Sequence, residues 1–144
     1  MESNLTDITR VIQLAVAPVF LLTAIATMIN ALNTRLGRIV DRRRVVQERL
    51  HTRAADAAAA AQLEIRTLVR RSRLVYYAIF CAVLSALLVC LVVAGAFLGA
   101  LLGVDLARSV AALFIAAMLA MIAGLGLFLR EVYLAVRTGT HNQP

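Results

Sequence analysis

The sequence changes character within residues 11–44, which read VIQLAVAPVFLLTAIATMINALNTRLGRIVDRRR. The stretch begins as an apolar run, and an apolar run of about 20 residues is long enough to cross a bilayer as a helix. It then becomes rich in arginine, and arginines crowded at one end of such a run tend to stay in the cytoplasm. The stretch therefore predicts a first membrane span and its orientation.

The composition is that of a small membrane protein rather than a soluble domain. Of the 144 residues, 62% are hydrophobic, whereas soluble domains are nearer half apolar. The formal net charge is +7, and all fifteen basic residues are arginine. Eleven of them lie between Arg35 and Arg73 with four carboxylates, so this segment alone carries a net charge of +7. We expect it to lie against anionic phospholipid at the surface of the lipid bilayer.

The chain is predicted to form a single membrane domain over residues 1–144, all-α, with three transmembrane helices. The first two spans continue as long cytoplasmic helical extensions, which form a helical hairpin by reversing near residues 52–57 with Asp56 as a cap. Another arrangement stays open, because the alanine-rich centre of this segment carries no turn signal. The predicted bounds are about 8–32 for the first span, 33–74 for the cytoplasmic segment, 75–102 and 106–130 for the other spans, and 131–144 for the cytoplasmic tail.

The arginines are distributed unevenly about these predicted spans. Arg10 and Arg108 fall on one side, and the other thirteen fall on the opposite side. Because basic residues favour the cytoplasmic side, the N-terminus is predicted outside and the C-terminus inside. The chain is thus expected to be a multi-pass protein of the bacterial cytoplasmic (inner) membrane.

A polar face runs along the first span and continues beyond it. The functional interpretation is a pore or water-filled cavity lined by this face in an oligomer. The plainer interpretation is that these groups bond to the backbone or across helices, and Thr can do so within its own helix. Asn30 is harder to hide than the threonines, so it favours a cavity or a helix contact. The pore-lining candidates are Thr23, Thr27, Asn30, Thr34, Asp41 and Glu48.

A basic stripe lies beside the polar face. In a ring of subunits it would form a positively charged cytoplasmic mouth that attracts anions and phosphates. The plainer interpretation is a solvated face that pairs with carboxylates or lipid headgroups. If selectivity is set at the mouth, an arginine ring predicts anions and a ring of Asp41 and Glu48 predicts cations. The stripe consists of Arg35, Arg38, Arg42 and Arg49.

Small residues recur at four-residue spacing in the second and third spans, which allows helices to approach closely in lipid. The two spans could pack on each other, or these faces could pack between subunits. The residues are Gly95, Gly99, Gly103, Ala116, Ala120 and Gly124. A coiled-coil-like seam is also predicted through Leu50, Ala54, Ala57, Ala61, Ile65 and Leu68.

The sequence contains no pattern typical of an enzyme. It lacks paired carboxylates, a Ser–His arrangement, metal-ligand spacing and a glycine-rich phosphate loop. We therefore expect no catalytic residues, no metal, no cofactor and no nucleic-acid partner.

Three segments carry a resemblance: IQLAVAPVFLLTAI, NTRLGRIVDRRR and FLREVYLA. They resemble a family of small bacterial integral membrane proteins known as domain of unknown function 2721. The likeness covers about residues 5–137, with RLGRIVDR as its most specific part, and it implies a three-span membrane protein but no activity. The matching positions are Gln13, Pro18, Asn33, Arg35, Arg38, Asp41, Arg42, Arg130 and Glu131.

Glu131 is expected at the same membrane face as the RLGRIVDR segment. We predict that it pairs with Arg35 or Arg38 and so locks the third span against the first.

Two functions are compatible with these features. Three helices offer little internal surface to hide the polar groups, so a homo-oligomer is expected. The first hypothesis is a small ion channel with the first span lining the path and an arginine-rich cytoplasmic vestibule, which passes small ions. The alternative is a non-conducting membrane scaffold or regulator whose basic helices bind anionic lipid or a partner protein.

Overall fold

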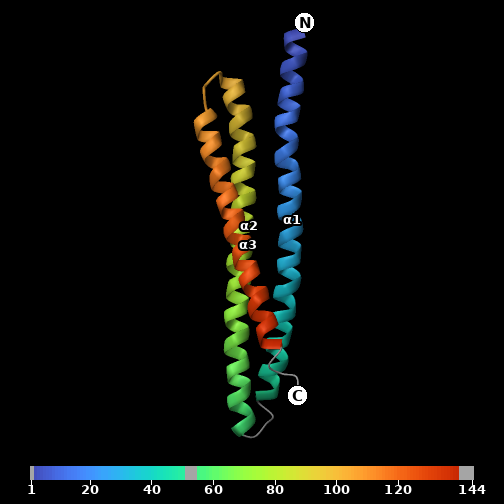
Figure 1. Ribbon diagram of the computed structural model, residues 1–144, viewed down its shortest axis with the longest axis vertical. Coiled ribbons are helices and arrows are strands. Elements are labelled where there is room, and N and C mark those ends of the chain that lie inside the picture. Colours follow the sequence, from blue (N-terminus) through green and yellow to red (C-terminus); the bar gives the residue numbers. More distant parts are fainter. Residues whose placement is uncertain (1, 51–54, 140–144) are drawn as a thin grey trace. The chain divides into compact units, whose positions relative to one another are not determined.

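The computed structural model describes residues 2–50 and 55–139. It contains three helices in chain order, α1 (Glu2–Leu50), α2 (Ala55–Leu102) and α3 (Ala107–Gly139), which Figure 1 labels. Throughout the described ranges the regular structure is helical, without strands. Each helix includes a stretch long and apolar enough to cross a membrane. The predicted all-α fold with three membrane-length helices is therefore confirmed.

The helices are longer than the predicted spans because the flanking residues are also good helix formers. α1 passes Pro18 and continues to Leu50, and α3 runs through much of the predicted tail to Gly139. The predicted reversal near residues 52–57 falls partly on 51–54, which lie outside the described residues. Residues 55–57 are already helical, so Asp56 stands in the first turn of α2 rather than before it.

A short turn joins α2 to α3. Gly103 has a φ of +64°, a left-handed conformation that glycine adopts without steric cost. The Val104 N–H donates to the Gly99 carbonyl at 3.2 Å, which closes the last turn of α2. The Asp105 Oδ1 accepts a bond from the Ala107 N–H at 3.0 Å, so Asp105 caps the start of α3.

The chain divides into two compact units, and every helix contributes to both. Unit 1 comprises Met1–Ile29 and Cys81–Ile122, and unit 2 comprises Asn30–Phe80 and Ala123–Pro144.

In unit 2, the buried side chains of α1 recur every seven residues. Leu32, Ile39 and Val46 are buried, and seven residues are nearly two helical turns, so these side chains share one face. The positions three residues further on complete the three-four spacing of a coiled-coil seam. These positions hold Arg35, Arg42 and Arg49. The seam of α1 in unit 2 therefore alternates between an aliphatic residue and an arginine.

The same spacing continues along α2. In unit 2 its buried apolar residues are Leu68, Val75 and Ala78. The three-four spacing also includes Glu64, four residues before Leu68, and Arg71, between Leu68 and Val75. The α2 seam of unit 2 thus contains both signs of charge.

The seam that we predicted from the apolar pattern is buried at Leu68. Ala61 and Ile65 are half-buried, as is Glu64, which pairs with Arg42 of α1. Leu50 is half-buried, and the side chains of Ala54 and Ala57 lie outside the described part.

In unit 1 the seam is almost entirely apolar and small. Ile25 and Met28 of α1 are buried, as is Ala117 of α3. On α2 the buried positions are Ala82, Ser85, Val89 and Val92. The Ser85 hydroxyl donates to the Ala117 carbonyl at 2.8 Å, so this polar side chain of the seam has a partner on α3.

Large apolar side chains cover the outward faces of the helices. So many exposed large apolar side chains are unusual on a water-soluble protein and are compatible with a multi-pass membrane protein. Its most exposed members include Phe20, Phe80, Leu101, Leu129 and Tyr133.

Candidate functional site

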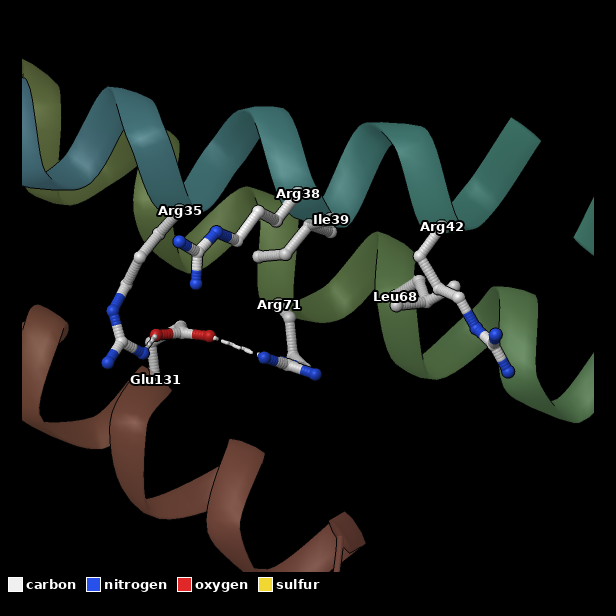
Figure 2. A pocket seen from close by; sticks show the side chains of 7 residues that line it. All are labelled: Arg35, Arg38, Ile39, Arg42, Leu68, Arg71 and Glu131. Atoms are coloured by element: carbon white, nitrogen blue, oxygen red, sulfur yellow. Dashed lines mark hydrogen bonds and ion pairs between the residues drawn. The ribbon is translucent and has the colours of Figure 1, made fainter. Parts of the chain in front are cut away.

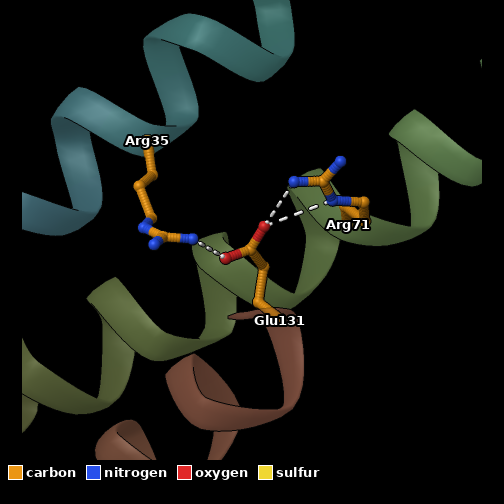
Figure 3. Close-up of polar contacts among 3 residues, drawn as sticks. All are labelled: Arg35, Arg71 and Glu131. Carbon is orange, nitrogen blue, oxygen red and sulfur yellow. Dashed lines mark hydrogen bonds and ion pairs between the residues drawn. The ribbon is translucent and has the colours of Figure 1, made fainter. Parts of the chain in front are cut away.

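The site is centred on Glu131 of α3, which is completely buried. Its Oε2 accepts a bond from Nη1 of Arg35 on α1 at 2.9 Å. Its Oε1 accepts two bonds from Arg71 on α2, from Nη2 at 2.9 Å and from Nε at 3.2 Å. Figure 3 shows the carboxylate between the two guanidinium groups. One carboxylate therefore joins the three helices within unit 2, and the predicted pairing with Arg35 is confirmed.

Burial of this carboxylate is tolerable because both of its oxygens are bonded. An ionised group without partners in a low-dielectric interior costs several kcal/mol, and paired, hydrogen-bonded charges offset much of that cost. The two arginines are less buried than Glu131, since their side chains are 39% (Arg35) and 20% (Arg71) exposed. In this cluster the carboxylate is fully buried, and the two arginine side chains are partly exposed.

Arg71 was not identified from the sequence. It is one of several arginines before the second predicted span, and neither its charge nor its neighbours set it apart. The signal was its position in the three-four repeat, because the spacing through Leu68 and Val75 assigns Arg71 to the seam. A charged residue at a seam position requires a partner, and Glu131 occupies the corresponding buried row of α3 with Ala117 and Gly124.

Arg35 has a second contact within the same unit. Its guanidinium carbon lies 5.2 Å from the centroid of the Phe128 ring on α3. A cation over an aromatic face is attracted by the ring quadrupole. Phe128 lies three residues before Glu131, so both side chains come from one face of α3 and together orient Arg35.

The remaining arginines of the basic stripe are arranged differently. Nε of Arg42 bonds Oε1 of Glu64 on α2 at 2.9 Å, in a pair whose side chains are about half exposed. Arg38 is exposed and has no hydrogen bond or ion pair with any residue in the described ranges. Arg49 is exposed near the end of α1.

A pocket of about 330 Å³ lies beside the Glu131 cluster, wholly within unit 2. Figure 2 shows the side chains of Arg35, Arg38 and Arg71 directed toward the space around the carboxylate. Its lining consists of Arg35, Arg38, Ile39, Arg42, Leu68, Arg71 and Glu131. The structure therefore brings three of the four basic-stripe residues to one hollow.

The polar face of α1 lies away from the other helices. In unit 2, Asn30, Thr34, Asp41 and Glu48 are all exposed. At about 100° per residue, they are displaced by about half a turn from the buried row through Leu32. In unit 1, Thr23 and Thr27 are likewise exposed, about half a turn from Ile25.

The threonines of this face are bonded within α1. Each hydroxyl donates to the carbonyl four residues earlier, Thr23 to Val19 at 3.0 Å, and Thr27 to Thr23 and Thr34 to Asn30 at 2.9 Å each. Threonine hydroxyls bonded in this way need no further partner.

The small residues of unit 1 lie at a close approach of α2 to α3. A Cβ built on Gly95 would lie 3.3 Å from Val110, and one on Gly99 would lie 3.2 Å from the Val104 carbonyl oxygen. Gly103 serves the turn instead, with nothing within 4 Å of a built Cβ. On α3, Ala116 and Ala120 are half-buried, and Gly124 is buried in unit 2.

Among the residues that the structure describes, no three His, Cys, Asp or Glu side chains gather closely enough to hold a metal ion.

The family described as Protein of unknown function (DUF2721) matches residues 15–140. Comparison with curated proteins and with solved structures gives no match.

Proposed function

This chain belongs to the DUF2721 family, and from that premise we propose that it is a homo-oligomeric membrane protein whose α1 helices turn their polar faces to a shared axis and form an ion path. The proposal rests on one observation. The polar face of α1 is exposed and lies about half a turn from the side that packs within the chain.

An exposed amide within an apolar helix favours association. The side-chain amide of Asn30 has no hydrogen bond among the described residues, and an unpartnered amide facing lipid is unfavourable. Copies of the same face meeting around an axis would remove Asn30 from lipid, and cyclic symmetry is the usual way in which identical surfaces close.

The proposed orientation follows from the arginines. The N-terminus is outside, the C-terminus is inside, and the segments of α1 and α2 in unit 2 extend as a hairpin into the cytoplasm of a bacterium. The support is the crowding of eleven arginines between Arg35 and Arg73, since basic residues favour the cytoplasmic side of an inner membrane. A C-terminal reporter active only in the cytoplasm tests this orientation.

The contacts of the basic stripe favour cations over anions as the conducted ions. Arg35 and Arg42 are paired with Glu131 and Glu64 inside the chain, so their charge is partly neutralised. Asp41 is exposed on the polar face. In the proposed assembly it forms a ring of carboxylates at the mouth, which is a common device of cation-selective pores.

The decisive experiment measures oligomeric state and flux on the same preparation. The full chain is purified in detergent, its mass is measured by light scattering, and it is reconstituted into liposomes loaded with potassium chloride. We expect an oligomer and potassium flux that exceeds chloride flux. Asn30→Leu should reduce the flux strongly, and Asp41→Asn should reduce the preference for potassium.

The matched control for Asn30→Leu is Asn33→Leu. It introduces the same side chain at an exposed position outside the polar face, so flux should remain near that of the unmodified protein. A monomer in detergent and in membranes would contradict the proposed assembly.

A non-conducting scaffold is the second candidate, and the threonine bonds favour it. Three hydroxyls of the polar face are bonded within α1. Fewer groups on that face therefore need hydrogen bonds to water than its composition suggests. Silent liposomes from an oligomeric preparation would support the scaffold and contradict the channel.

A further inference from the structure

The pocket beside Glu131 carries more positive than negative charge. Four arginines and one carboxylate line it. Glu131 is shared by Arg35 and Arg71, and Glu64, just outside the lining, pairs with Arg42. Four guanidinium groups therefore face two carboxylates, which leaves an excess of two positive charges around one hollow.

Arg38 supplies the free part of this charge. Its guanidinium has no hydrogen bond or ion pair within the described residues, and it is directed into the same space as Arg35 and Arg71 (Figure 2). Its N–H groups are consequently available to a ligand. A guanidinium offers planar, paired donors that match two oxygens of a phosphate.

The pocket is already shaped without a ligand. Glu131 holds Arg35 and Arg71 through three hydrogen bonds, and Phe128 supports Arg35 from one side. Fixed donors lose less freedom on binding than mobile surface side chains do. A volume of about 330 Å³ is at the small end of ligand sites and has room for a phosphate with an attached group.

The position along the chain is suited to a phosphate at a membrane surface. The predicted spans end at residue 32, begin at residue 75 and end at residue 130, and the three residues of the Glu131 cluster lie within four residues of these limits. Charged groups at the ends of spans lie at the level of lipid headgroups.

We propose that the pocket lined by Arg35, Arg38, Arg42 and Arg71 is a binding site for a phosphate group, carried by an anionic lipid or free in solution. The site goes beyond the proposed ion path and does not require it, because the pocket lies on the flank of the buried row of α1 rather than on its polar face. Its failure and the failure of the flux experiment are therefore separate outcomes.

The test uses the full chain in nanodiscs, with the thermal unfolding midpoint as the readout, since a ligand that binds the folded state raises this midpoint. In one arm, the phosphatidylglycerol fraction of phosphatidylcholine nanodiscs is increased. In the other arm, inorganic phosphate is added to pure phosphatidylcholine nanodiscs, with chloride at equal ionic strength as the reference. A specific rise in the first arm identifies a lipid headgroup, and a rise in the second identifies free phosphate.

Arg38→Gln removes the free guanidinium without breaking a bond seen in the described structure. We expect the apparent dissociation constant of the responding ligand to rise about tenfold, as for loss of one charge-assisted contact. Arg44→Gln is the matched control, because it removes the same charge from an exposed position on the same helix. Arg44 does not line the pocket. It should change the constant less than about twofold, through long-range charge alone.

A gain of binding provides a measurement that misfolding cannot imitate. Glu64→Gln releases Arg42 from its pair and adds one positive charge beside the pocket, so ligand binding should tighten about threefold. Asp41→Asn makes the same charge change on the polar face and should have a smaller effect.

Two results would overturn the proposal. One is the absence of a rise in the midpoint with phosphatidylglycerol in the first arm, together with no rise beyond that caused by chloride in the second. The other is an equal loss of binding in Arg38→Gln and Arg44→Gln, which would show that diffuse charge rather than the pocket attracts the anion.

Discussion

The seams of the two units share a seven-residue spacing, but the seam side chains are apolar in unit 1 and partly charged in unit 2. In unit 1 the seam contains aliphatic residues, alanine and glycine, with Ser85 as its polar member on α2. In unit 2 the same spacing contains Arg35 and Arg71, which share the buried Glu131 of α3, and Arg42 and Glu64, which pair with each other. The periodicity alone therefore does not determine whether a seam of this chain is apolar or charged.

The difference shows what stabilises each unit: close packing of the helices in unit 1 and pairing of buried charges in unit 2. Where small side chains allow the backbones of α2 and α3 to approach closely, packing and a single hydroxyl bond suffice. Where charges enter the seam, every inward charge must find a partner, because an unpaired buried charge is far more costly than an imperfect apolar contact. We expect substitutions to divide along the same line.

Glu131→Gln should have the largest effect, because it removes the negative charge shared by two inward arginines. We expect a loss of about 3 kcal/mol in the free energy of unfolding, the lower end for a broken buried pair, since Arg35 is partly hydrated. Thermal unfolding of the purified full chain in detergent measures it. An unchanged midpoint would show that the cluster does not hold unit 2 together.

Gly99→Val tests the close approach in unit 1. A Cβ at this position would lie 3.2 Å from the Val104 carbonyl oxygen and 3.4 Å from Cβ of Leu106, so the larger side chain forces α2 and the turn apart. We expect a loss of about 2 kcal/mol, typical of overpacking. Gly37→Val is the control, because a Cβ there has nothing within 4 Å, and its midpoint should not fall. Equal effects would mean that the packing of α2 against the turn is not tight.

Ser85→Ala should have a smaller effect in the same unit. It removes the 2.8 Å bond to the Ala117 carbonyl, but that carbonyl belongs to a helix and retains its backbone partner. We expect a loss of about 0.6 kcal/mol, the average for such bonds in membrane proteins. Ser72→Ala, which removes a hydroxyl bonded to Val69 within its own helix, should cost less in the same unfolding assay.

Glu64→Gln should have the smallest effect on stability. It removes one charge, as Glu131→Gln does, but its pair with Arg42 is about half exposed. Solvent screens such pairs, so a loss below about 0.5 kcal/mol is expected. A loss comparable to that of Glu131→Gln would mean that burial does not determine how much an ion pair contributes to the stability of unit 2.

Much of the fold could be predicted from the sequence because span-length apolar runs and arginine clusters are strong local signals. The three helices follow from such signals. The pairing of Glu131 with Arg35 was also predictable, since both residues lie at the ends of predicted spans.

The rest depended on which residues face inward, and apolarity was a poor guide to that. Ile65 is more apolar than Glu64, yet Glu64 pairs across the seam with Arg42. Arg71 looked like one more member of a surface cluster. A search for seven-residue spacing without regard to polarity would have placed both charged residues on the seam.

The shared carboxylate has a consequence for the axial alignment of the helices. Rows of alanine, valine and leucine that repeat every seven residues look nearly alike after a slide of one repeat, which is about 10 Å along a helix. Glu131 meets Arg35 and Arg71 in one alignment of α1, α2 and α3, and a slide of any one of them separates it from a partner. A single acidic side chain can thus fix the register of three helices whose apolar rows would tolerate several.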